Sequence, residues 1–132
     1  MSNVALKFEY TVTTPKSFDN AVEAVTDNVA KVGFRVLHVH DVQGTFREKG
    51  VDIAPYKIVE VCNVKYAKQA LDKDLLIGLM MPCKINVYEQ DQQTKISLML
   101  PSAMPGFFPN AGLEQLADDV ESILRKVVDE AK

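Results

Sequence analysis

The sequence predicts an α+β protein of two layers, in which one antiparallel, five-stranded sheet is covered by helices on one face. Five segments alternate apolar and polar residues, with the period of a strand that buries one side. Two longer segments carry apolar stripes at helical spacing, and both stripes need a sheet face to cover. The expected order is strand, helix, four strands and helix, with a small helix between the third and fourth strands.

The first strand and the first helix have clear signals. Alternation runs from Val4 to Val12, and Ser17 follows at a position where its hydroxyl can cap a helix. Gly33 is expected to end that helix, because glycine adopts the left-handed conformation at low cost. The buried stripe of the helix is predicted to be Phe18, Ala21, Val22, Val25, Val29 and Val32.

The second and third strands are predicted at residues 35–42 and 56–62. The connection 43–55 contains two glycines and a proline, and a helical turn is expected within it. Strict alternation in the second strand puts Leu37 and Val39 on one face. It puts Val36, His38, His40 and Val42 on the other face.

The second half of the chain follows the same logic. Asn63 is a natural cap for a short helix, and the apolar run 75–81 is expected to be a buried approach to the next strand. Strands at 83–89 and 95–100 should form a hairpin across a polar turn. The last helix is predicted from the stripe Leu113, Leu116, Val120, Ile123, Leu124 and Val127.

Composition limits the classes of function. A chain of 132 residues with 47% apolar and 25% charged residues suits a single globular domain, residues 1–132. A net charge of −3 argues against a general nucleic-acid binder, which needs a basic surface. The sequence shows no leader pattern and no apolar run of membrane-spanning length, so we expect a cytoplasmic protein without a membrane partner.

The two cysteines mark the first candidate site. In a meander of the middle strands, Cys62 and Cys83 would lie at the same rim of the sheet, although alternation directs Cys62 to the face of Glu60. Cys62 also precedes the helix start at Asn63, where partial positive charge lowers a thiol pKa. The primary candidates are therefore Cys62, Cys83, Glu60 and Asn63. The structural alternative is two small buried residues that fill strand ends.

The sheet face turned away from the helices is the second candidate. Imidazole, carboxylate and thiol groups suit borderline and soft metal ions, but a dimer interface or a half-wet sheet has the same mixed character. The secondary candidate residues are His38, His40, Asp41 and Tyr88. The face as a whole is expected to carry His38, His40, Glu60, Cys62, Asn86, Tyr88 and Ser97, with Val36, Ile58 and Met99.

A set of short motifs is shared with a known family. They are Gly33-Phe34-Arg35-Val36-Leu37, Asp41, Pro55-Tyr56-Lys57-Ile58, Cys62-Asn63, Ile77-Gly78-Leu79, Pro82-Cys83 and Val87-Tyr88-Glu89. Through them, nearly the whole chain resembles the family called domain of unknown function 302. The resemblance implies a fold like that of the TATA-binding-protein superfamily, with a curved antiparallel sheet, and usually a homodimer. It implies no activity, and it gives His38 and His40 no role.

Three hypotheses of function follow. The first is a dimeric, non-enzymatic module that binds a small molecule or a partner near Cys62 and Cys83 or on the open sheet face. The second is a thiol-dependent protein that handles sulfur or redox state through Cys62, with Cys83 as resolving partner. The third is a metal or haem binder. No catalytic residue or metal ligand set is assigned from the sequence, and the cofactor is left unknown.

Overall fold

The computed structural model describes residues 7–132 and confirms the predicted fold class. The sheet has the strand order β1-β5-β4-β3-β2, and every neighbouring pair is antiparallel. The strands are β1 Glu9–Thr14, β2 Arg35–Asp41, β3 Tyr56–Cys62, β4 Cys83–Gln90 and β5 Gln93–Met99. The α-helices are α1 Phe18–Lys31, α2 Val42–Arg47, α3 Val64–Lys73 and α4 Glu114–Ala131. Two 3₁₀ helices complete the chain, η1 Leu75–Met80 and η2 Pro101–Gly106.

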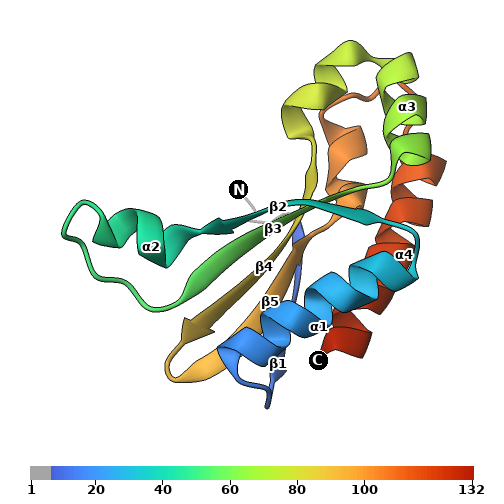
Figure 1. The fold of residues 1–132 in the computed structure, drawn as a ribbon. Helices are drawn as coiled ribbons and strands as arrows, with labels where there is room; N and C mark the ends of the chain where they lie inside the picture. The colour runs from blue at the N-terminus through green and yellow to red at the C-terminus, as the bar shows by residue number, and fades with distance from the viewer. Residues whose placement is uncertain (1–6) are drawn as a thin grey trace, which may run out of the picture.

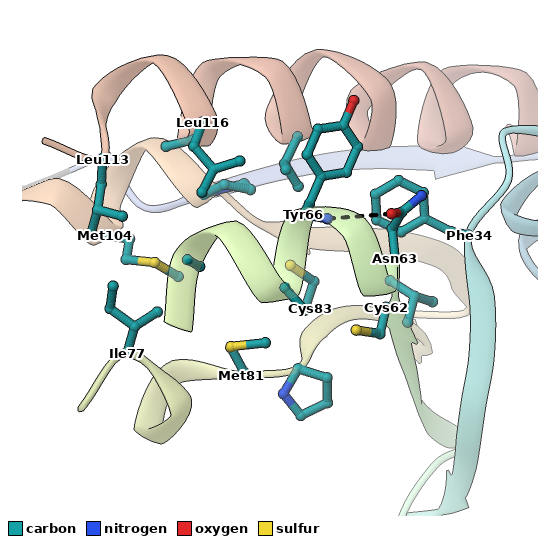
Figure 2. Close-up of a pocket in the computed structure, with 17 residues that line it drawn as sticks. Phe34, Cys62, Asn63, Tyr66, Ile77, Met81, Cys83, Met104, Leu113 and Leu116 are labelled. Carbon is teal, nitrogen blue, oxygen red and sulfur yellow. Dashed lines mark hydrogen bonds between the residues drawn. The ribbon is translucent and has the colours of Figure 1, made fainter. Parts of the chain in front are cut away.

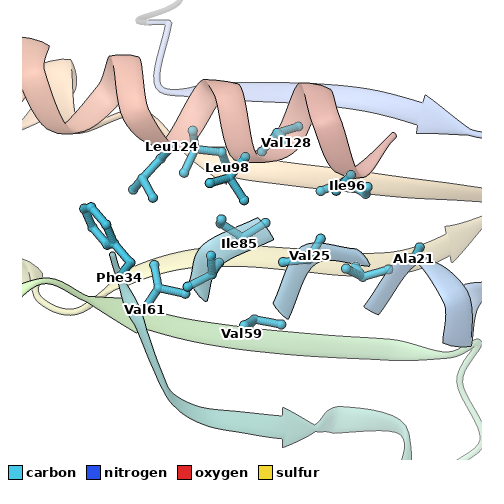
Figure 3. Close-up of a cluster of buried hydrophobic side chains, with 14 of the residues drawn as sticks. Ala21, Val25, Phe34, Val59, Val61, Ile85, Ile96, Leu98, Leu124 and Val128 are labelled. Carbon is cyan, nitrogen blue, oxygen red and sulfur yellow. The ribbon is translucent and has the colours of Figure 1, made fainter. Parts of the chain in front are cut away.

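The core lies between the sheet and the two longest helices, α1 and α4 (Figure 1). Figure 3 shows side chains of α1 and α4 facing side chains of β3, β4 and β5. The contacts come from fully buried residues, among them Val25, Val29, Val59, Ile85, Ile96, Leu98 and Leu124. The apolar stripes of both helices therefore cover the same sheet face, as their periodicity predicts.

The boundaries of α1 and of the hairpin follow from local chemistry. The Ser17 hydroxyl accepts a hydrogen bond from the Asn20 amide at 3.2 Å, and Gly33 has a φ of 79° just past the helix. Asp91 and Gln92 take positive φ values in the two-residue turn between β4 and β5, as type I′ turns require. The part of the first predicted strand that contains Val4 lies outside the described residues.

Strand β2 departs from the predicted alternation because it contains a bulge. The register with β3 shifts between Val36 and His38, so that Val36 lies opposite Val61 and Val39 lies opposite Val59. An extra residue in one strand reverses the face of the side chains beyond it. Val36 and Val39 both pack against the core, whereas Leu37 is 51% exposed. The placement of Val36 on the open face and of Leu37 with Val39 was wrong.

The segment 75–81 also differs from expectation. It forms η1, in which Ile77 is fully buried while Leu75, Leu76 and Leu79 are exposed by 81%, 61% and 83%. The prediction of a buried approach was wrong, because the short 3₁₀ helix presents only one of its large apolar residues to the core. In Figure 1, α3 and η1 lie beyond the end of β3, and α2 lies at the opposite end of that strand.

Candidate functional site

An apolar pocket lies where β3 ends and β4 begins (Figure 2). Its walls come from the two strand ends, from α3, η1 and η2, and from the first turns of α4. Its empty volume is about 550 Å³, including the space open to solvent at the mouth. The lining residues are Phe34, Val61, Cys62, Asn63, Tyr66, Ala67, Ala70, Ile77, Met81, Pro82, Cys83, Pro101, Met104, Leu113, Leu116, Ala117 and Val120.

Both cysteines are half-buried free thiols that line this pocket. Cys62 is the last residue of β3 and Cys83 is the first of β4, and Cys83 lies opposite Val61 in the register. The prediction that they meet at one rim of the sheet is confirmed. The expectation that Cys62 faces away from Cys83 was wrong. The chain leaves β3 at Cys62 and turns into α3, and this turn brings the thiol to the pocket wall.

The surroundings of the thiols oppose activation. Burial raises the pKa of Cys83 to about 11, and the charge of a Cys62 thiolate is a second, smaller cause. Burial also raises the pKa of Cys62. The lowered pKa expected from the helix start was therefore wrong. The Asn63 side chain, rather than a thiolate, accepts hydrogen bonds from the free backbone amides at the start of α3. The donors are Lys65 at 3.0 Å and Tyr66 at 3.4 Å.

Asn63 also organises one wall of the pocket. Its amide donates a hydrogen bond to the Gly33 carbonyl at 3.3 Å, which ties the start of α3 to the turn between α1 and β2. Phe34 follows that turn and stacks on Tyr66 of α3, with 6.1 Å between ring centroids. One polar side chain thus holds together two segments that are distant in sequence, and both aromatic rings line the pocket.

Glu60 does not belong to this pocket. It lies on the open sheet face, where its Oε1 is 3.0 Å from His40 Nε2. The His38 and His40 rings are in edge contact, with 4.3 Å between centroids. The structure therefore divides the primary candidates into two groups, with Cys62, Cys83 and Asn63 at the pocket and Glu60 beside the histidines.

The other secondary candidates have structural partners. Asp41 caps α2 by accepting a hydrogen bond from the Gly44 amide at 3.0 Å. Tyr88 stacks on Tyr56 with 5.1 Å between centroids, and its hydroxyl lies 2.7 Å from Ser97 Oγ. Both residues stabilise the sheet end and its open face, and neither lines the apolar pocket.

Several residues of the pocket were missed by sequence reasoning. Met81, Tyr66 and Leu113 shape its walls together with Met104 of the proline- and methionine-rich segment before α4. Of the first three, only Leu113 was singled out, as part of a helix stripe. The available signal was the position of the methionines directly beside the strand-end cysteine and in the proline-rich segment before α4. Methionine commonly fills irregular gaps and lines adaptable binding surfaces.

The described part of the chain gives the metal hypothesis no support from classical ligands. Within residues 7–132, no three histidine, cysteine, aspartate or glutamate side chains gather where they could hold a metal ion. None of the helices described is both long enough and apolar enough to cross a membrane.

Fold and site together define a two-layer α+β protein with an apolar pocket at one rim of an antiparallel sheet. The family model described as domain of unknown function DUF302 matches residues 10–131, so the chain belongs to this family. The crystal structure of an uncharacterized conserved DUF302 protein from Bacillus stearothermophilus is 32% identical. The match covers 96% of this chain and 100% of that one, with a TM-score of 0.90. The comparison with curated proteins gives no match.

Proposed function

We propose that this protein binds a small, largely apolar molecule in the pocket between the β3–β4 rim, α3 and α4, without chemical conversion of it. The observation that carries this function is the lining itself. Fully or nearly fully buried side chains such as Ile77, Leu113 and Val120 form the walls, and the space between them stays open to solvent. Small-molecule sites in proteins are typically concave and mostly apolar with few polar groups, and this lining has that composition.

The polar groups at the pocket favour an uncharged ligand. Among the described residues that line it, none is a lysine, arginine, histidine, aspartate or glutamate. A ligand charge buried there would lack a partner, which is costly in an apolar surrounding. The Asn63 side chain is already engaged with two amides and one carbonyl, and the raised pKa values keep both thiols neutral at pH 7.

A titration with the neutral, environment-sensitive probe N-phenyl-1-naphthylamine tests this function. The matched variants are Ala67→Phe, which projects a ring into the pocket from α3, and Ala30→Phe on the exposed side of α1. We expect wild type and Ala30→Phe to enhance the fluorescence alike and Ala67→Phe to bind at least about tenfold more weakly, a loss of about 1.4 kcal/mol. Equal binding by Ala67→Phe and wild type would exclude the pocket as the binding site.

Thiol chemistry is a second candidate, favoured by the meeting of two free cysteines at one pocket. The two functions separate in the variant Cys62→Ser. A thiol function requires that this variant lose activity toward a disulfide or persulfide reagent, whereas an apolar site retains the naphthylamine probe. Alkylation of native protein by iodoacetamide at pH 7 measures the same difference. The raised pKa values predict that both thiols react more slowly than a cysteine in a model peptide.

We propose further that the protein acts as a homodimer through its open sheet face. The face away from α1 and α4 carries the half-buried Ile58 between polar neighbours, and the stacked rings of Tyr56 and Tyr88. Sedimentation analysis of Ile58→Lys, with Val64→Lys on exposed α3 as its control, tests this assembly. We expect Ile58→Lys to sediment as a monomer and Val64→Lys as a dimer, and a monomeric wild type would refute it.

A further inference from the structure

Three of the sulfur atoms drawn in Figure 2 belong to Cys62, Cys83 and Met81, which line the pocket. A fourth sulfur, of Met104, lies on the opposite wall. They come from separate elements, β3, β4, the residue after η1, and η2. The pocket lining therefore offers a metal ion four sulfur donors. Among the described residues that line it, there is no histidine, aspartate or glutamate, the other common metal ligands.

The fold holds three of these residues together for structural reasons. The pairing of Cys83 with Val61 places Cys62 one register step away, and both thiols line the same pocket. Met81 directly follows η1, two residues before Cys83, and it packs against the cluster that contains the fully buried Ile77. Met81 is therefore anchored beside the cysteines by η1.

The donor chemistry selects one kind of ion. Thiolate and thioether sulfurs are soft ligands that prefer copper(I), whereas zinc sites are usually tetrahedral and magnesium or calcium need oxygen. Charge balance points the same way. One monovalent cation that replaces the proton of one thiol gives a neutral complex and releases that proton to solvent. A neutral complex suits an apolar pocket, and a divalent ion would reach neutrality only by displacing the protons of both thiols.

We propose that Cys62, Cys83 and Met81 form a binding site for a single copper(I) ion in the lining of the pocket. Met104 lies on the far wall and contributes less. The site uses the same cavity as the apolar ligand but does not depend on the binding of that ligand. It also differs from a histidine site, because His38 and His40 lie on the open sheet face.

An anaerobic competition titration tests the site with copper(I) itself. Reduced, metal-free protein is titrated with copper(I) held by the chromophoric chelator bicinchoninate, and the absorbance of the chelator complex reports transfer. We expect wild type to withdraw one equivalent and to develop a near-ultraviolet sulfur-to-copper charge-transfer band. Cys62→Ser and Cys83→Ser should weaken binding by more than the roughly 10- to 100-fold typical of a lost supporting partner. Met81→Leu should weaken it by about tenfold.

The matched control is Met99→Leu, which changes a methionine 46% exposed on β5 that does not line the pocket. It should bind copper(I) as wild type does. Circular dichroism checks the folding of each variant, and Cys62→Ser with Met81→Leu decides the matter if Cys83→Ser does not fold. Failure of wild type to compete, or equal retention by all variants, overturns the copper site. Naphthylamine binding by the same metal-free protein then tells whether the apolar pocket fails as well.

Discussion

The pocket rim and the open sheet face are built from the same strands, yet their polar groups behave differently. At the rim, α3, η1 and α4 close around Cys62 and Cys83, and burial raises the pKa of both thiols. On the open face, neither α1 nor α4 covers His40 and Glu60, whose side chains are 45% and 22% exposed. The comparison teaches that the pocket is created by elements packed at the rim, namely α3 and η1 between β3 and β4, together with η2 and α4. The sheet alone would leave both faces wet.

The largest expected effect contrasts two leucines of the pocket region. Leu113 is 1% exposed at the pocket wall, whereas Leu79 of η1 is 83% exposed. We expect Leu113→Ala to lower the free energy of unfolding by about 2–5 kcal/mol, since it removes packed methyl groups and enlarges the cavity. Leu79→Ala should change it by less than about 0.5 kcal/mol. Urea denaturation of both variants measures the difference, and equal values would mean that the pocket wall is not part of the cooperative core.

The second effect is a pH dependence of stability that the rim should show. The pKa of Cys83 is raised from its ordinary value near 9 to about 11. Above pH 9 the unfolded chain releases this proton while the folded protein retains it, so stability is complete below pH 9 and falls as pH rises toward 11. The loss should be at most roughly 2–3 kcal/mol.

Denaturation of wild type and Cys83→Ala between pH 8 and 11 isolates this contribution. Lysines and tyrosines titrate in the same window, so the difference between the two proteins is the relevant quantity. We expect the wild-type advantage to shrink with increasing pH. A difference that stays constant would show that Cys83 is not buried as its contacts indicate.

The third effect concerns the cap that shapes the aromatic wall. Asn63→Ala removes both the cap of α3 and the bond to the Gly33 carbonyl, and should cost about 0.5–2 kcal/mol. Asn63→Asp keeps an acceptor for the helix amides but loses the donor, so it should recover most of that cost. Thermal unfolding compares the three proteins. Equal loss in both variants would assign the stabilisation to the Gly33 bond instead of the cap.

The smallest effect is expected on the open face. The His40–Glu60 pair is partly exposed, and such pairs contribute about 0–1 kcal/mol. A double-mutant cycle with His40→Asn and Glu60→Gln measures their coupling at pH 6. A coupling well above 1 kcal/mol would indicate that this face is buried in solution, as a tight dimer interface would bury it.

The elements of the fold were predictable because each has a local signal. Ser17, Gly33 and Asn63 mark helix ends by their own chemistry, and the antiparallel pairing of β4 with β5 follows from their two-residue turn. The bulge between Val36 and His38 was not predictable, since it is a shift in the register of β2 against β3. The sequence of β2 alone does not show such a shift. Which residue of η1 is buried was not predictable either, because an apolar run without a clear period does not indicate which side chain faces the core.

Only part of the candidate site was visible in the sequence. Cys62, Cys83 and Asn63 were found because they flank predicted strand and helix ends, and the meander of the strands brings them together. The electrostatics of the thiols depend on tertiary burial by α3, η1 and α4, which a sequence pattern does not report. For the same reason the local rule for helix starts gave the wrong direction for the pKa of Cys62.

The bulge in β2 also bears on self-association. β2 is an outer strand of the sheet, and its unpaired backbone edge is open to strand addition from another molecule. An irregular register twists such an edge and makes continuous pairing with a foreign strand difficult. The bulge in β2 therefore disfavours edge-to-edge pairing of this strand with a strand of a second molecule.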